Sequence, residues 1–303
     1  MKRLFLFALV LVISACPVFA GGKLRVVSTL PDYAWLAEQV GGDLVSVKAL
    51  AKGSQDPHYV DAKPSYLPAL HKADVLLLTG LDLEVGWLPP LLRQAGNNDI
   101  QPGNFGYVDL SQFTEPIEVP QGGADRSMGD VHPYGNPHFS LDPVIMSELA
   151  LALAEVFARS DPENAEAYRA NARKTRDLLG KLDEEIRSIV EPVRGIPIVT
   201  YHATQNYFFK RYGLHLLDFI EPKPGIKPSP KTLLSLEKKM KARGATVILT
   251  EPYQDVKIAE RVAKDVGAVV VQAPSYTGGS PKAKTYPDLI RLMARKLAGA
   301  AHG

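Results

Sequence analysis

The chain has 303 residues, of which 46% are hydrophobic and 22% are charged, and its formal net charge is +2. A chain of this length and composition should form one or two domains with ordinary buried cores. The small, evenly spread charge gives no indication of nucleic acid binding.

Residues 1–20 have the three regions of a secretory signal peptide. A basic start is followed by an apolar run at 4–15 and by a small-residue cleavage site that ends at Ala20. The apolar run is shorter than the roughly 20 residues that a membrane-spanning helix needs. We therefore expect export to the periplasm, with cleavage before Gly21.

Cys16 is the only cysteine, and it leaves a second interpretation of this segment open. The letters ISAC resemble a bacterial lipoprotein box, in which Cys16 would be lipidated and would begin the mature chain. Pro17 directly after the cysteine fits such a box poorly, so cleavage before Gly21 is favoured. The mature chain then has no cysteine, and nitrogen and oxygen atoms must supply any metal ligands.

Short apolar runs alternate with helical patterns twice along the chain. Near-continuous apolar strands alternating with helices are typical of parallel α/β sheets. The sequence therefore predicts an α/β fold with two lobes, each a four-stranded parallel sheet with flanking helices. The predicted strands are residues 24–29, 45–50, 75–80 and 106–110 in the first half and 196–201, 215–220, 246–250 and 268–273 in the second. The helical patterns between them include residues 31–41, 64–73, 231–243 and 255–266.

A long amphipathic pattern separates the two sets of strands. It begins with the spacing of a capping box at Ser160 and Glu163, and its apolar residues recur at helical intervals. A helix of about 30 residues spans roughly 45 Å, which is longer than one small lobe. We therefore predict one long rigid helix at 160–191, which joins an N-terminal lobe at 21–159 to a C-terminal lobe at 192–303.

Four candidate metal ligands lie where predicted strands end. His202 and Glu251 directly follow strands of the second set, and His58 lies in a loop after a strand of the first set. His138 lies between the first set and a helix that should begin near Pro143. In open α/β sheets, ligands bind outside the carboxyl ends of the strands, so these groups map onto one crevice. Any one loop histidine is more often a solvated or capping residue, and the separations here match no local metal-binding motif.

The remaining histidines favour structural explanations. His71 lies on the exposed side of a helical pattern, His215 begins a strand, and His302 lies in the C-terminal tail. His132 is closer to the candidate site, in the stretch GDVHPYGNPHFSLDP, where proline and glycine stiffen the loop. We interpret His132 as a residue that braces this loop, with metal ligation as the alternative.

Three blocks of the sequence resemble the metal-binding subunits of bacterial ABC importers for zinc and manganese, the cluster A-I binding proteins. The blocks read DPHYVDAKPSYLPALHKADVLLLTGLDLEVGWL, NPHFSLDP and TYHATQNYFFKRYGL. In that family the second block commonly reads P-H-x-W-L-D-P, so Phe139 and Ser140 depart modestly from the pattern. The resemblance covers essentially the whole mature chain.

This resemblance implies that His58, His138 and His202 are metal ligands and that a rigid helix spans two α/β lobes. It also implies a binding protein rather than an enzyme. This binding protein would deliver its ion to a permease in the inner membrane, which works together with an ATPase. We expect the protein to be a monomer.

The fourth ligand is where this sequence departs from the family. That ligand is usually an acid in the loop after the last strand, but the matching stretch QAPSYTGGSP contains neither Asp nor Glu. Asp288 comes later, in a helical pattern, and is poorly placed. Glu251 is a possible fourth ligand, with a role in orienting a histidine and a bound water as the alternatives.

Three imidazoles favour Zn²⁺, because zinc prefers nitrogen and sulfur ligands whereas Mn²⁺ favours carboxylate and water oxygens. Zinc is therefore the expected ligand, with manganese as the alternative. A periplasmic zinc hydrolase with Glu251 as its general base is a further alternative, because three histidines and a water also form catalytic sites. An adhesion protein with the same fold has little support, since the sequence shows no obvious exposed apolar or repeated segment.

Overall fold

Each predicted set of strands forms one four-stranded parallel sheet in the computed structural model, which describes residues 22–120, 132–222 and 225–300. All eight predicted strands are confirmed, with ends that agree to within two residues. The first sheet has the order β2-β1-β3-β4, with β1 at Leu24–Ser28, β2 at Val45–Ala49, β3 at Val75–Leu78 and β4 at Tyr107–Asp109. The second has the order β6-β5-β7-β8, with β5 at Pro197–Thr200, β6 at His215–Phe219, β7 at Val247–Thr250 and β8 at Val269–Gln272. The expected signal peptide lies outside the described residues.

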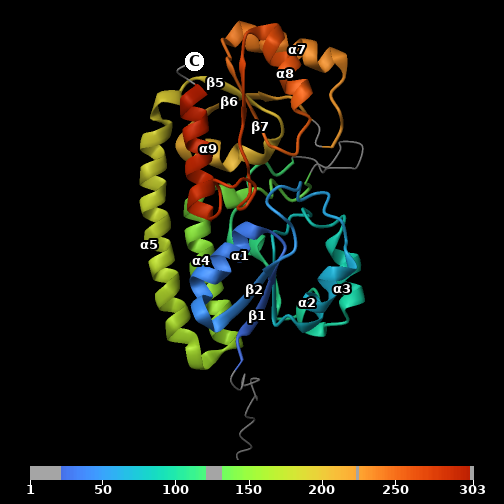
Figure 1. Ribbon diagram of the computed structural model, residues 1–303, viewed down its shortest axis with the longest axis vertical. Coiled ribbons are helices and arrows are strands. Elements are labelled where there is room, and N and C mark those ends of the chain that lie inside the picture. Colours follow the sequence, from blue (N-terminus) through green and yellow to red (C-terminus); the bar gives the residue numbers. More distant parts are fainter. Residues whose placement is uncertain (1–21, 121–131, 223–224, 301–303) are drawn as a thin grey trace, which may run out of the picture.

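The two sheets share one strand order, and each is flanked by helices, so the predicted α/β class is confirmed (Figure 1). The inner strands β3 and β7 are buried along their whole length, which explains why they read as unbroken apolar runs. The helices of the first lobe are α1 at Pro31–Gly41, α2 at Leu67–Lys72 and α3 at Leu88–Ala95. Those that follow β5 are α6 at Asn206–Tyr212, α7 at Pro230–Arg243, α8 at Val256–Val266 and α9 at Tyr286–Ala300.

Two long antiparallel helices, α4 at Pro143–Ser160 and α5 at Ala165–Val190, lie along one side of the molecule (Figure 1). The 26 residues of α5 span about 39 Å, and the helix passes beside both lobes. Its buried stripe packs against α4 and α1 near one end and against α9 near the other. The Arg291 guanidinium of α9 lies 2.9 Å from the Glu185 carboxylate of α5. The predicted linking helix is thus present, within the predicted range.

The predicted start of that helix is wrong. Ser160 does not cap it, because Ser160 is the last residue of α4, and its hydroxyl donates to the carbonyl of Val156. Asp161 organises the corner instead: its carboxylate accepts hydrogen bonds from Asn164 at 2.8 Å and from the Tyr168 hydroxyl at 2.7 Å. These bonds stabilise a reverse turn at the place where the capping pattern predicted the first turn of the linking helix.

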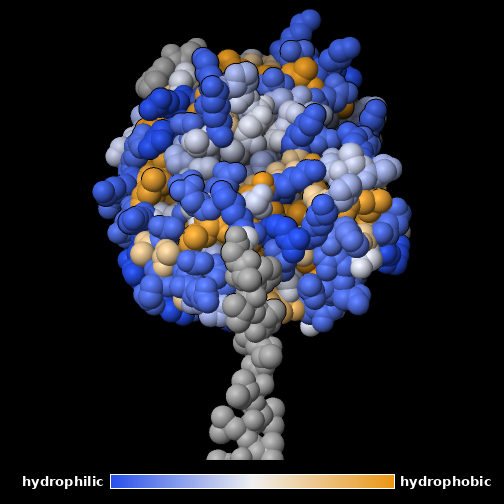
Figure 2. Space-filling view, turned by 60° about the horizontal axis from the view of Figure 1, so that its bottom comes forward, coloured by the Kyte–Doolittle hydropathy of each residue, from blue (hydrophilic) through white to orange (hydrophobic). Residues whose placement is uncertain are grey.

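One hydrophobic core runs through both lobes. It joins side chains of the first sheet, such as Val26, to Leu182 of α5 and to Val247 of the second sheet. A smaller cluster covers the outer side of the second sheet. On the face shown in Figure 2, hydrophobic residues are scattered among hydrophilic ones. Within the described ranges, no helix combines the length and apolar character that crossing a membrane requires.

Candidate metal centre

Three imidazole side chains from separate loops meet where the two lobes face each other. His58 lies in the loop after β2, His138 in the turn before α4, and His202 two residues after the end of β5. One ring nitrogen of each lies within 4.8 Å of a ring nitrogen of both others. Their ring centroids are 5.3 to 5.5 Å apart. The structure thus brings together the three histidines that the sequence analysis selected.

The inner nitrogens of this cluster are free to bind an ion. His58 Nδ1 lies 2.6 Å from an Asp56 carboxylate oxygen, and His138 Nδ1 lies 3.0 Å from the Tyr276 hydroxyl. The Nε2 atoms of His138 and His202 are buried and have no hydrogen-bond partner among the described residues. Buried polar atoms almost always have a partner, so these two nitrogens indicate a ligand. The carboxylate behind His58 is the kind of group that orients a metal-binding imidazole.

Burial keeps His138 and His202 neutral. Burial, and then the charge of His58, lowers the pKa of His202 to about 3. The same two causes lower the pKa of His138 well below its usual range. Burial alone would raise the pKa of Asp56, but hydrogen bonds and charge from His58 outweigh it and lower that pKa. His138 and His202 therefore offer neutral nitrogen lone pairs, the form in which histidine binds a metal.

His132 makes the bracing contact expected from the sequence, but it also touches the histidine cluster. Its Nδ1 lies 3.1 Å from the carbonyl oxygen of Leu81, which is the bracing contact that was expected. Its Nε2, however, lies 3.1 Å from Nε2 of His58. The six-residue spacing between His132 and His138 on a stiff loop was the sequence signal that could have given it more weight.

Glu251 lies outside the group of close ligand atoms, although it directly follows β7 as expected. Its side chain is fully buried, and its Oε1 accepts a 2.8 Å hydrogen bond from Gln205. Burial raises the pKa of Glu251 to about 7, so near neutral pH much of this group carries a proton. A protonated carboxyl is a weak metal ligand, because ligands must be deprotonated to bind.

The Glu251→Gln variant should gain thermal stability relative to the unaltered protein as the pH rises from about 5 to about 8. Between pH 4.5 and 7 the folded state holds a proton on Glu251 that the unfolded state has lost. The contribution of this group to the free energy of unfolding therefore falls as the pH rises through that window. Glutamine does not titrate, so the variant does not suffer this decrease in the free energy of unfolding. Melting temperatures of both metal-free proteins at the two pH values measure it, and a difference that does not change with pH would contradict the assigned pKa.

Asn136 links the His138 loop to the His202 loop, and sequence reasoning missed it. Its Oδ1 accepts a 2.9 Å hydrogen bond from the backbone N–H of His138. Its Nδ2 donates to the Ala203 carbonyl at 2.8 Å and to the Glu118 carboxylate at 3.0 Å. These bonds fix the relative position of two of the three histidines across the lobe boundary.

The remaining residues considered from the sequence contact their local surroundings. His71 Nδ1 lies 2.8 Å from the Ala95 carbonyl, and His215 is exposed on β6. Asp288 accepts hydrogen bonds from Thr285 at the start of α9, so it serves as part of a helix cap. His302 lies outside the described residues.

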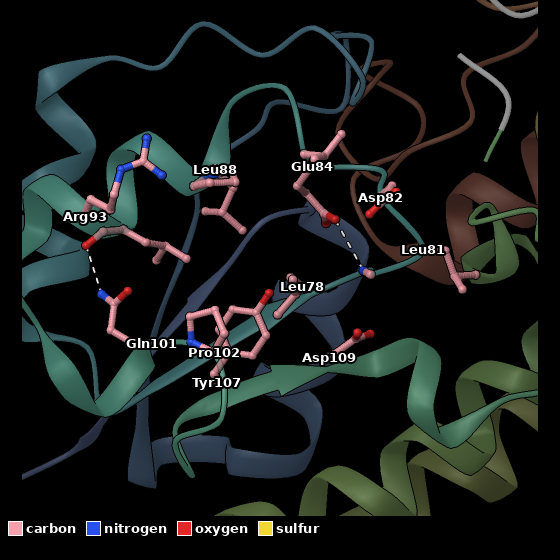
Figure 3. A pocket seen from close by; sticks show the side chains of 14 residues that line it. Leu78, Leu81, Asp82, Glu84, Leu88, Arg93, Gln101, Pro102, Tyr107 and Asp109 are labelled. Carbon is pink, nitrogen blue, oxygen red and sulfur yellow. Dashed lines mark hydrogen bonds between the residues drawn. The ribbon is translucent and has the colours of Figure 1, made fainter. Parts of the chain in front are cut away.

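The space beside the histidines suits a small ion. A pocket of about 110 Å³ is lined by His132, His138 and His202, together with Glu118 and Asn136. Organic ligands generally need pockets of roughly 300–1,000 Å³. A larger pocket, of about 390 Å³, lies at the side of the first lobe and includes no histidine (Figure 3). The chemistry of the smaller pocket makes it the candidate site.

Two parallel α/β lobes, one long helix beside both and a histidine cluster between them define a two-lobed protein built to bind a metal ion. Residues 26–300 match the family model of ZnuA, described as zinc-uptake complex component A, periplasmic. The chain belongs to this family, which confirms the resemblance seen in the three sequence blocks.

Individual relatives agree with this assignment. The chain is 29% identical over 302 residues to the high-affinity zinc uptake system protein ZnuA of Paracoccus denitrificans, with 90% of each chain covered. It is 26% identical over 307 residues to the manganese ABC transporter substrate-binding lipoprotein PsaA of Streptococcus mitis, covering 97% of this chain and 96% of that one. A crystal structure of ZnuA matches with a TM-score of 0.75 at 26% identity, covering 92% of this chain and 99% of that one.

Proposed function

We propose that this protein captures one Zn²⁺ ion between its lobes and delivers it to the permease of an ABC importer, which works together with an ATPase. His58, His138 and His202 are the proposed ligands. The observation that carries this proposal is the convergence of their ring nitrogens to within 4.8 Å, with two buried Nε2 atoms that have no other partner in the described part of the chain.

Zinc fits this donor set better than manganese does. All three close ligand atoms are imidazole nitrogens, which suit Zn²⁺, whereas Mn²⁺ favours carboxylates and water. Burial raises the pKa of Glu251 to about 7, and this carboxyl already bonds to Gln205. None of the three close ligand atoms is an oxygen, so this donor set favours zinc over manganese.

Binding without catalysis also fits the site better than hydrolysis. The small pocket leaves little room for an organic substrate beside the ion. The general base of a hydrolase must lie within hydrogen-bonding reach of the attacking water. Glu251 is fully buried and already bonded to Gln205, so it is poorly placed for that role.

Export should place the protein where it can meet an inner-membrane permease. The basic start, the apolar run and the small-residue site of residues 1–20 support cleavage before Gly21. Intact-mass measurement of the exported protein should give the mass of a chain that begins at Gly21. A lipidated chain that begins at Cys16 would establish the lipoprotein form instead.

The proposed function makes a direct prediction for the purified mature protein. One equivalent of Zn²⁺ should bind, and zinc at about 100 times the dissociation constant should stabilise the fold by about 2.7 kcal/mol through mass action. Isothermal titration calorimetry and thermal melting measure both effects, with Mn²⁺ as the comparison ion. Deleting the gene should slow growth in zinc-depleted medium, and added zinc should restore it. A protein that shows no thermal shift with excess zinc would overturn the proposal.

A further inference from the structure

We infer that His132 is the fourth zinc ligand, so that the ion is held by four imidazoles and by no carboxylate. This inference rests on the proposed function, and it assigns the ligand position that the sequence left open. It follows from how the rings of His132 and His58 face each other and from the turn that holds His132.

The protons of the two facing rings are fixed by their outer contacts. A backbone carbonyl can only accept a hydrogen bond, so His132 Nδ1, 3.1 Å from the Leu81 oxygen, must carry the hydrogen. His58 Nδ1 lies 2.6 Å from the Asp56 carboxylate and donates to it in the same way. The Nε2 atoms of both rings therefore face inward, and they lie 3.1 Å apart.

Ligands at the usual Zn–N distance of about 2.0–2.1 Å in a tetrahedral site are roughly 3.4 Å apart, close to the separation seen here. The His132 ring also lines the same small pocket as His138 and His202. An ion bound to His58 would therefore have His132 Nε2 as its next available donor.

The turn that carries Leu81 is strained, which indicates that the Leu81 carbonyl has a positioning role. Figure 3 shows Glu84 hydrogen-bonded to the start of this turn, beside Leu81 and Asp82. Gly80, Leu81 and Asp82 all have positive φ, at 82°, 53° and 63°. Glu84 fixes the start of this turn, because its buried carboxylate accepts hydrogen bonds from the Thr79 N–H at 2.8 Å and the Gly80 N–H at 3.3 Å. The turn thereby directs the Leu81 carbonyl at His132 and orients the ring, as partners of metal-bound histidines commonly do.

The test separates ligation by His132 from its bracing contact. Asparagine can place an N–H where Nδ1 of histidine lies and so keep the bond to Leu81, but it has no counterpart of Nε2. We would compare His132→Asn and His132→Ala with His215→Ala, which removes an exposed histidine on β6. Zinc affinity would be measured by chelator competition, and zinc-edge X-ray absorption would count the imidazoles around the ion. Melting of the metal-free variants would show that they fold.

We expect both His132 variants to lose more than about 100-fold in affinity, beyond the 10–100-fold range of outer-shell partners. The absorption spectrum should change from four nitrogen neighbours to three plus an oxygen, while His215→Ala should keep four. If His132→Asn keeps the affinity and spectrum of the unaltered protein, the inference is wrong and His132 only braces the loop. That result would leave the proposed function intact, whereas failure of the unaltered protein to bind zinc would overturn the proposed function itself.

Discussion

Replacing His58, His138 or His202 singly by alanine should lower zinc affinity by more than about 100-fold, beyond the range expected for outer-shell partners. Each ring supplies one of the three nitrogens that lie within 4.8 Å of one another, so each single replacement removes one ligand of the ion. The affinity of each variant would be measured by chelator competition at neutral pH.

Two sets of controls distinguish a metal ligand from a distant histidine and from an outer-shell partner. His71→Ala and His215→Ala remove histidines distant from the site and should leave affinity unchanged. Asp56→Asn weakens the hydrogen bond behind His58 and should fall within the smaller, 10–100-fold range. If one of the three alanine variants lost no more affinity than Asp56→Asn, that histidine would not be a ligand.

Gly53→Ala should weaken zinc binding about 5- to 150-fold, although residue 53 donates nothing to the ion. Gly53 follows β2 in the first lobe, and its backbone lies directly against the loop of Thr277 and Gly279 in the second. A Cβ at Gly53 would lie 2.5 Å from the Gly279 nitrogen, and a Cβ at Gly279 would lie 2.5 Å from the Gly53 oxygen. Overpacking of this kind typically destabilises the packed arrangement by about 1–3 kcal/mol.

The reason for the effect on zinc is that the site needs both lobes. The added methyl group would push apart the loops that lie beside His58 and Tyr276, and an energy of 1–3 kcal/mol corresponds to about 5- to 150-fold in affinity. Gly180→Ala on α5 is the matched control, since a Cβ there would meet nothing within 4 Å. Calorimetry would measure the zinc affinities of Gly53→Ala and Gly180→Ala. Equal affinities would show that the contact at Gly53 does not support the site.

Local patterns in the sequence were enough to predict the strands and the meeting of the three histidines. Buried strands such as β3 are apolar along their whole length, and His202 lies two residues after the end of β5, so both features are visible within a few residues. The turn at Asp161 was missed because a serine–glutamate spacing resembled a cap, while the bond from Tyr168 that stabilises the turn is a tertiary contact between two helices.

The contacts that complete the site could not be predicted, because they join residues far apart in the chain. Tyr276 meets His138 across 138 positions, and His132 meets His58 across 74. The Asp32 carboxylate accepts a hydrogen bond from the backbone of Thr277, 245 positions away. Burial raises the pKa of Asp32 to about 6, an effect that depends wholly on the assembled fold. A single sequence without covariation carries no signal for pairs at such separations.

The hydrophobic core that runs through both lobes restricts how a bound metal ion can leave the site. Because α5 packs against helices of both lobes and apolar side chains run continuously from β1 to β7, a wide rotation of one lobe would expose buried hydrocarbon to water. Loop segments can move without that penalty. His58 is less buried than His138 or His202, and much of its loop is exposed or half-buried. Unloading is therefore expected to proceed one bond at a time, from the His58 side inward, so that a docked permease need only displace one loop to start the exchange.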